Sequence, residues 1–179
     1  MNDFRVVNYS VNDADRIDWV NEEWDRFALS NDAPGLLASA VIGSTLWSHI
    51  SDLTLRHLLQ KIFARARSSR QPLVLTCRCD APMVRRELDV CIESRDGRSI
   101  HVASTVTAEM PRRIPYTLGG RLGLIRMCSW CNAVDVGGQW VDLEVAVGEL
   151  GLLKGPHHPE ITHTLCLRCE QILRAESDL

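Results

Sequence analysis

Cys128-Ser129-Trp130-Cys131 is a C-x-x-C pair, and the same spacing returns at Cys166-Leu167-Arg168-Cys169, after 34 intervening residues. Two such pairs can converge on one tetrahedral Zn²⁺, each supplying two thiolates at about 2.3 Å. A tail of about 50 residues rarely folds on a hydrophobic core alone, and a metal can supply the missing stability. The pattern therefore predicts a structural four-cysteine zinc site in a small zinc-stabilised C-terminal module.

His163 lies three residues before the second pair, so five candidate ligands compete for four positions. We expect Cys128, Cys131, Cys166 and Cys169 to bind the metal and His163 to hydrogen-bond or pack beside them. A site of three cysteines and His163 is the alternative, and a redox or disulfide pair is another reading of C-x-x-C. Four thiolates leave no position for water, which argues against hydrolysis at the metal.

The basic neighbours of the two pairs, Arg126 and Arg168, are expected to offset the negative charge of four thiolates. Trp130 and Trp140 can either shield the metal or form an ordinary small core, and the second reading is the simpler one. Cys77 and Cys79 fall on the apolar face of a predicted strand. Buried cysteine usually behaves as a small hydrophobic residue, with a thiol sensor as the alternative.

Composition indicates a folded protein of one or two domains, with 179 residues of which 45% are hydrophobic and 24% charged. No apolar run reaches the roughly 18 residues that a membrane helix needs. The N-terminus does not resemble a signal peptide. We therefore expect a cytoplasmic protein with no membrane contact, in which the seven cysteines stay reduced.

The charge of the tail argues against nucleic acid as a partner. Residues 121–179 carry 5 basic and 8 acidic side chains before any thiolate is counted. A zinc module that grips DNA needs a positive face to displace counterions from phosphate. A zinc-containing transcriptional regulator therefore remains only an alternative.

Strands and helices alternate through the first part of the chain. Short strands are predicted at 5–10 and at 17–20, with Ile17 and Trp19 on one face of the second. Asn21 can cap a helix that runs to Ala28, and Asp52 or Ser51 can cap a longer helix over 53–67. The predicted order is therefore two strands first and the helices after them.

Three strands with clear alternation are predicted at 72–80, 85–94 and 98–106, the last two joined by a hairpin turn containing Asp96-Gly97. Alternation of this kind predicts an antiparallel sheet with one buried face. The fold class is thus α+β with a five-stranded antiparallel sheet. Residues 107–121 lack a clear period, and the tail then predicts short helices over 140–150 and 165–177.

This order of elements resembles the PAS sensor fold. Ile17-Asp18-Trp19-Val20-Asn21-Glu22-Glu23-Trp24 looks like the PAS phrase at the second strand and first helix, and Val41-Ile42-Gly43-Ser44-Thr45-Leu46-Trp47 resembles the turn before the ligand-side helices. The resemblance implies a PAS-like sensor domain at 1–110, a linker at 111–121 and a zinc-binding module at 122–179. It also implies an unidentified small ligand in a pocket between sheet and helices.

The tail resembles the small cysteine module that follows PAS or receiver domains in bacterial signalling proteins. The chain departs from that pattern at Asn132, where the family has lysine, and at Thr162, where it has serine. Neither change removes a thiol. The matching residues are Cys128, Cys131, Trp140, Glu144, His163, Cys166 and Cys169.

These resemblances predict a signal-transduction or regulatory module that senses a small ligand or partner. Its output would pass through a homodimer or a signalling protein partner. A thiol or zinc redox sensor is the main alternative. No nucleophile elbow, phosphate loop or H-E-x-x-H motif is present, so we do not expect an enzyme.

Overall fold

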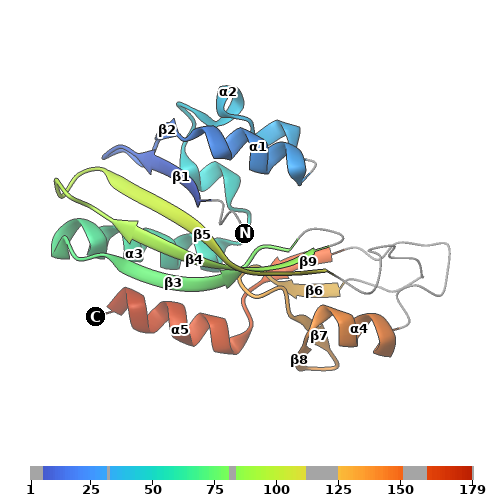
Figure 1. Ribbon diagram of the computed structural model, residues 1–179. Helices are drawn as coiled ribbons and strands as arrows, with labels where there is room; N and C mark the ends of the chain where they lie inside the picture. The colour runs from blue at the N-terminus through green and yellow to red at the C-terminus, as the bar shows by residue number, and fades with distance from the viewer. Residues whose placement is uncertain (1–5, 32, 81–83, 112–124, 151–160, 179) are drawn as a thin grey trace.

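A five-stranded antiparallel sheet in the order β2-β1-β5-β4-β3 organises the first part of the chain, as a computed structural model shows (Figure 1). The structure describes residues 6–31, 33–80, 84–111, 125–150 and 161–178. The α+β class and the five antiparallel strands confirm the prediction. The strands are β1 (Val6–Val11), β2 (Ile17–Val20), β3 (Leu73–Arg78), β4 (Val84–Glu93) and β5 (Ile100–Pro111).

Alternating hydrophobicity accounts for the buried face of this sheet. Leu73 and Leu75 of β3 are buried, while Val74 between them is exposed. The same period places Leu88 and Ile92 of β4 in the core. The β4–β5 ladder continues to Val84 opposite Pro111, so β5 runs beyond the predicted end at residue 106.

The register of β2 corrects one prediction. Ser10 pairs with Trp19, whereas the next residue of β1 pairs with Ile17, so Asp18 is an extra residue in the ladder. Such a bulge interrupts alternation. Ile17 is 1% exposed and Trp19 is 50% exposed, so the two side chains do not share an environment.

Helices cover the buried face of the first sheet. Asp52 caps the long helix α3, because its carboxylate accepts hydrogen bonds from the N–H groups of Thr54 and Leu55. Asn21 occupies the cap position of α1 but binds β1 instead, accepting from Asn8 N–H and donating to the Val6 carbonyl. The helical segments are α1 (Glu22–Ser30), η1 (Pro34–Leu36), α2 (Ala38–Val41), η2 (Leu46–His49) and α3 (Leu53–Ser69).

The C-terminal part contains a second sheet in the order β8-β7-β6-β9. β9 runs parallel to β6, with Cys128 opposite Thr164, while the other pairs are antiparallel. The predicted helix over 140–150 is wrong at its start, because Gly137 and Gly138 adopt positive φ and turn the chain into a hairpin that contains Trp140. The elements are β6 (Ile125–Cys128), β7 (Val134–Val136), β8 (Gln139–Val141), α4 (Leu143–Glu149), β9 (Ile161–Thr164) and α5 (Leu167–Asp178).

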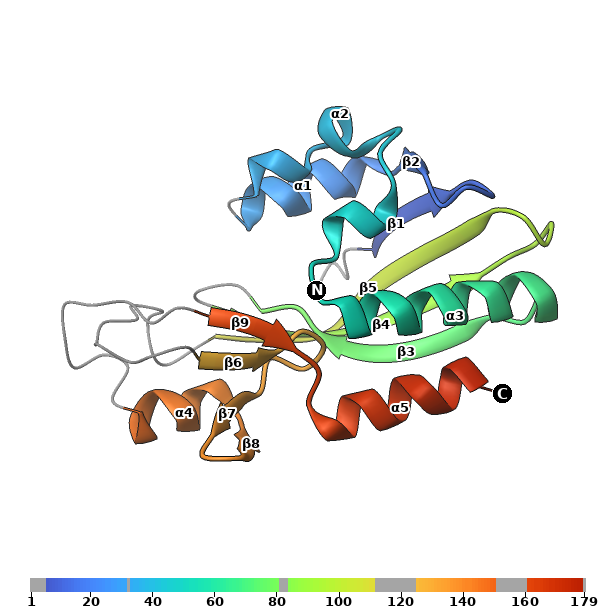
Figure 2. The same ribbon diagram turned by 180° about the vertical axis from the view of Figure 1, so that it is seen from behind.

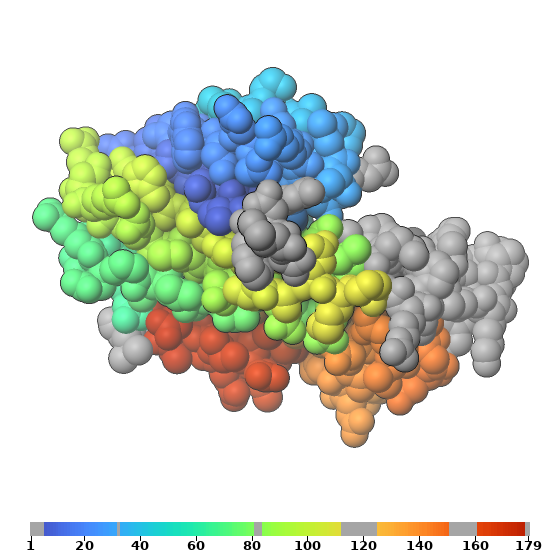
Figure 3. Space-filling view, viewed as in Figure 1, coloured from blue at the N-terminus to red at the C-terminus, as the bar shows by residue number. Residues whose placement is uncertain are grey.

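The last helix packs on the first part of the chain. α5 runs beside α3, and Arg65 donates to the carbonyl and to the carboxylate of Glu176 at 2.7 and 3.0 Å (Figure 2). In the space-filling view α5 lies against the green residues of α3 and β3 (Figure 3). Leu173 is fully buried in the same cluster as Ile62 and Phe63. One continuous core therefore joins α5 to the first sheet.

The proposed division into residues 1–110, 111–121 and 122–179 stays a prediction, and most of the predicted linker lies outside the described residues. A second buried cluster of five residues is confined to the C-terminal part. Among the described helices, none combines the length and apolar character that crossing a membrane requires.

Candidate metal centre

The two C-x-x-C pairs meet at the junction of the two sheets. The Sγ atoms of Cys128, Cys131, Cys166 and Cys169 all lie within 4.8 Å of one another. The sulfurs of Cys131 and Cys166 are 3.8 Å apart, and all four thiols are free. Tetrahedral zinc with Zn–S bonds of about 2.3 Å places its sulfurs about 3.8 Å apart. The group is therefore compatible with a bound metal such as zinc.

Parallel pairing of β6 and β9 brings the pairs together. Cys128 ends β6, and Cys166 follows β9 by two residues. Because parallel strands end at the same edge, the chain reaches the site twice from one direction. This pairing is a long-range contact that the spacing of the cysteines alone does not reveal.

The first pair lies in a tight turn. Asn132 N–H donates to the Cys128 carbonyl at 3.0 Å, and Cys128 N–H donates to the Ala133 carbonyl at 2.7 Å. Asn132 has a φ of 58°, in the left-handed region that asparagine tolerates better than most residues. Asparagine at this position therefore suits the turn.

The second pair lies at the start of α5, where Cys169 occupies the first turn. Cys166 N–H donates to the Cys128 sulfur at 3.3 Å, and Cys169 N–H donates to the Cys166 sulfur at 3.4 Å. Backbone donors and the positive end of a helix both favour thiolate over thiol. The local fold thus supports negative charge on sulfur.

Hydrogen bonds among the sulfurs shift the pKa values of the cysteines in opposite directions. Bonds from the thiols of Cys131 and Cys169, helped by Cys166 N–H, hold the pKa of Cys128 far below its usual range. Sharing a proton with Cys128 raises the pKa of Cys131 to about 11 and raises that of Cys169 as well. Full deprotonation of the group therefore requires a cation to offset the repulsion, which metal binding supplies.

The structure does not place His163, Arg126 or Arg168 against the sulfur group as predicted. His163 is exposed on β9 and contributes no atom to the sulfur group. Arg126 binds Asp135, with its Nε 2.8 Å from the carboxylate, and lies over the ring of Trp140. Arg168 is exposed on α5. The charge of Arg126 is therefore matched by a carboxylate rather than by the thiolates.

Trp130 attaches the first pair to the first sheet, a role that the sequence did not predict. Its indole N–H donates to the Thr76 carbonyl at 2.9 Å, and its own carbonyl accepts from Arg78 N–H at 3.0 Å. β3 is an edge strand, so these bonds cover part of an open edge. Ser129 adds a third link, donating at 2.7 Å to the Asp52 carboxylate that caps α3.

A buried ion pair lies beside this contact. The guanidinium of Arg78 donates to Asp80 at 2.6 Å and to Asp142, which precedes α4, at 2.7 Å. The side chains of Arg78 and Asp80 are 8% and 7% exposed. Burial opposes ionisation of Asp80, but hydrogen bonds from Arg78, the Arg86 N–H and Asn132 outweigh it and keep its pKa below the usual range.

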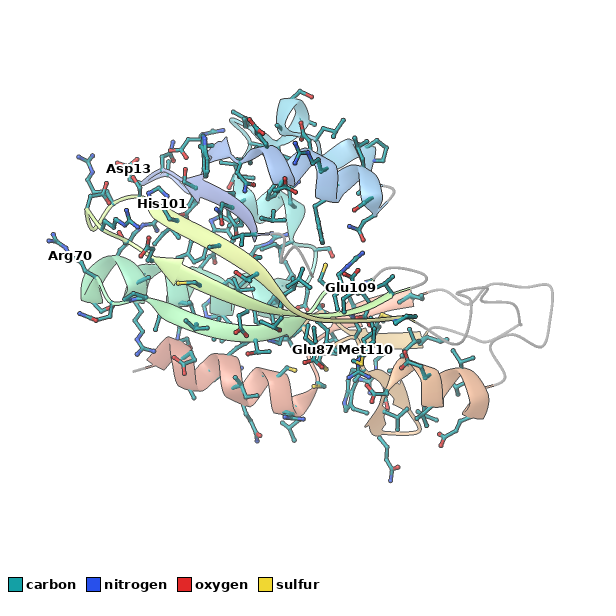
Figure 4. All side chains as sticks on the ribbon, in the orientation of Figure 1. Asp13, Arg70, Glu87, His101, Glu109 and Met110 are labelled. Atoms are coloured by element: carbon teal, nitrogen blue, oxygen red, sulfur yellow. The ribbon has the colours of Figure 1, made fainter. Side chains whose placement is uncertain are left out.

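A cavity of about 360 Å³ lies between α1 and the buried face of the sheet. Its walls are largely apolar, and they include Cys79 and Asp80, which directly follow β3. Glu87, Glu109 and Met110 lie at the end of β4 and β5 toward the second sheet, far from Asp13, Arg70 and His101 (Figure 4). The lining residues are Val7, Trp24, Phe27, Ala28, Asn31, Ala33, Leu36, Cys79, Asp80, Leu88, Ser104 and Val106.

The other two cysteines of this region fit the reading as small hydrophobic residues. Burial, followed by the nearby Cys79 and Asp89, raises the pKa of Cys77 to about 12. Burial also raises the pKa of Cys79. Protonated thiols are poor nucleophiles, so neither has the character of a reactive sensor.

No protein-family model matches this chain, and no curated protein is significantly similar to it. Function therefore has to be inferred from the geometry of the cysteine group and the cavity.

Proposed function

We propose that this chain is a bacterial signal-transduction or regulatory module: a PAS-like sensor domain joined to a module with a structural four-cysteine zinc site. Support comes from the order of elements, which is two strands, short helices, one long helix and a three-stranded meander. The resemblance of the sequence around residues 17–24 and 41–47 points to the same family. The proposal assigns no reaction to the chain.

Zinc is the metal that the donor set favours. Four thiolates in tetrahedral arrangement suit zinc, and they close the coordination shell against water. Three of the cysteines are buried and Cys131 is half-buried. The metal would therefore hold the turn of 128–131 to the start of α5, and would perform no chemistry.

The cavity is the observation that carries the sensor proposal. Its volume falls in the range of small-molecule sites, which begins at about 300 Å³. Asp80, the one acidic residue in its wall, already accepts from Arg78 and from Arg86 N–H. A saturated carboxylate offers little to a charged ligand, so the cavity favours a small, neutral and mainly apolar molecule.

Elemental analysis and native mass spectrometry of the purified protein test the metal and any retained ligand together. We expect one zinc per chain. A thermal-shift screen of neutral apolar compounds then tests the cavity, because a ligand stabilises the state that it binds. Absence of zinc from protein prepared without chelators would reject the metal assignment.

A pair of variants locates the ligand. Ser104→Leu fills the cavity, whereas Thr105→Leu places the same side chain at the next position of β5, which does not line it. We expect a compound that binds in the cavity to lose its thermal shift in the first variant and to keep it in the second. Equal shifts in both variants would place the compound elsewhere.

Oxidation sensing by the metal centre is the second candidate, and the partial exposure of Cys131 favours it. Thiolates are oxidisable, and zinc leaves when they are lost. If the centre is a sensor, low doses of peroxide release zinc before other thiols react. Retention of zinc until Cys91, a half-buried thiol outside the group, is oxidised would reject this candidate.

A further inference from the structure

The metal centre and the cavity share one structural element, the C-terminal end of β3. Trp130 lies between two metal-binding cysteines and contacts this strand through both its indole N–H and its carbonyl. β3 runs toward the second sheet and ends beside it (Figure 1). A change in the position of this strand end therefore reaches the Cys128–Cys131 turn directly.

The same strand end forms a wall of the cavity. Cys79 and Asp80, which follow β3 immediately, line the cavity. Asp80 is bound to the Arg78 side chain, and the Arg78 backbone N–H is bound to Trp130. Cys79 N–H also donates to the Arg86 carbonyl, so the wall is fastened to β4. Because Cys79 directly follows Arg78, a single hydrogen bond, from Arg78 N–H to the Trp130 carbonyl, links the cavity wall to the metal-binding turn.

We propose that Trp130 couples the cavity to the metal centre, so that filling the cavity slows release of the metal. The inference rests on the proposed function, since it takes the cavity as the ligand site and the sulfur group as the metal site. A molecule in the cavity restrains the wall at 79–80 and hence the end of β3. Restraining β3 holds Trp130, and with it the turn whose opening frees Cys128 and Cys131.

Coupling of this kind is reciprocal for equilibrium binding, so metal bound at the sulfur group also favours an occupied cavity. Arg78 extends the connection to the module through Asp142, which adds a second path that does not pass through Trp130. Loss of the Trp130 indole bond should therefore remove only part of the coupling, because the backbone bond from Arg78 to Trp130 and the Asp142 path both remain, and it should leave the fold intact.

A double-mutant cycle on zinc-loaded full-length protein tests the coupling. The cavity-filling variant Ser104→Leu stands in for a ligand, and Trp130→Phe removes the indole N–H but keeps an aromatic ring. The readout is the rate of zinc transfer to a colorimetric chelator. We expect Ser104→Leu to slow release about fivefold or more, and to lose part of this effect in the Trp130→Phe background, which keeps the Trp130 carbonyl bond to Arg78.

Two matched controls isolate the path. Thr105→Leu adds the same side chain outside the cavity, and Trp140→Phe makes the same aromatic change where the ring faces Arg126. Neither control should reproduce its partner's effect. Val106→Leu, a smaller addition to the same cavity wall, repeats the measurement if Ser104→Leu does not fold by circular dichroism.

Unchanged or faster release in a folded, zinc-loaded cavity-filling variant overturns the coupling, and a slowing that persists fully in Trp130→Phe overturns the part that the Trp130 side chain is given in it. These results leave the zinc assignment standing. A wild-type protein that binds no zinc instead rejects the proposed function, so the two failures are distinguishable.

Discussion

The first sheet and the C-terminal module are stabilised in different ways. The first sheet buries large aliphatic and aromatic side chains between its strands and α3, whereas the described residues of the module form a five-residue buried cluster of their own beside four thiols. Their cysteines differ in the same way. Cys77 is kept protonated by burial, while the four sulfurs of the module are held by N–H donors and by one another. Under the proposed function the small module thus depends on a metal and on its neighbour, where the larger body depends on packing.

Substituting one of the four grouped cysteines of the C-terminal module should cause the largest loss of stability. Cys169→Ser leaves three thiolates at a buried site, and structural zinc contributes about 10 kcal/mol or more to folding in small domains. We expect loss of bound zinc and a strongly lowered melting temperature. Because Cys169 shares a buried cluster with Phe63, the first sheet should melt in the same transition.

The matched control for this prediction is Cys91→Ser, which alters a half-buried thiol on β4 that lies outside the sulfur group. It should keep full zinc content. A Cys169→Ser protein with wild-type zinc, measured by elemental analysis, would contradict the site. Two separate melting transitions would show that the module unfolds alone.

A substitution that leaves a void at the contact between α5 and α3 should cause the next largest loss of stability. Leu173 is fully buried there, and a buried Leu→Ala substitution destabilises a protein by about 2–5 kcal/mol. Ile172→Ala is the control one residue away, because Ile172 is 46% exposed. Urea unfolding should show a large loss for Leu173→Ala and a much smaller one for Ile172→Ala. Similar losses would show that α5 does not rest on the first core.

The smallest expected effect is on the pH dependence of stability, and it comes from Cys77, a half-buried thiol outside the four-cysteine group. The pKa of Cys77 rises from 9.0 to about 12 on folding. Its contribution to stability is therefore present below about pH 9 and is lost as the pH rises toward 12, by at most about 1.4 kcal/mol per pH unit. Cys77→Ala should lose less stability than wild type between about pH 8 and about pH 10, the range in which an unfolded thiol titrates.

Urea unfolding of both proteins at the two pH values measures this difference, and comparing slopes cancels any constant loss from the missing sulfur. Identical slopes would mean that Cys77 titrates as an exposed thiol. The reading of Cys77 as a small buried group would then fail, whatever the state of the metal centre.

Local signals account for the parts of the fold that were predicted. Alternation defines β3 to β5, the Asp96-Gly97 turn joins β4 to β5, and Asp52 caps α3 as expected. The Gly137-Gly138 pair is an equally local signal that the helix prediction around Trp140 overlooked. The bulge at Asp18 is different, because it depends on how β2 meets β1.

The sequence by itself determined the α+β class, the buried face of the sheet and the four cysteines that form one group, because periodicity, turn chemistry and the C-x-x-C spacing act between near neighbours. Only the tertiary structure decided that β9 pairs in parallel with β6, that Trp130 covers the edge of β3 and that Leu173 enters the first core. These contacts join residues far apart in the chain. Many partners could satisfy an open strand edge or an apolar helix face, so the choice among them rests on how the whole chain packs.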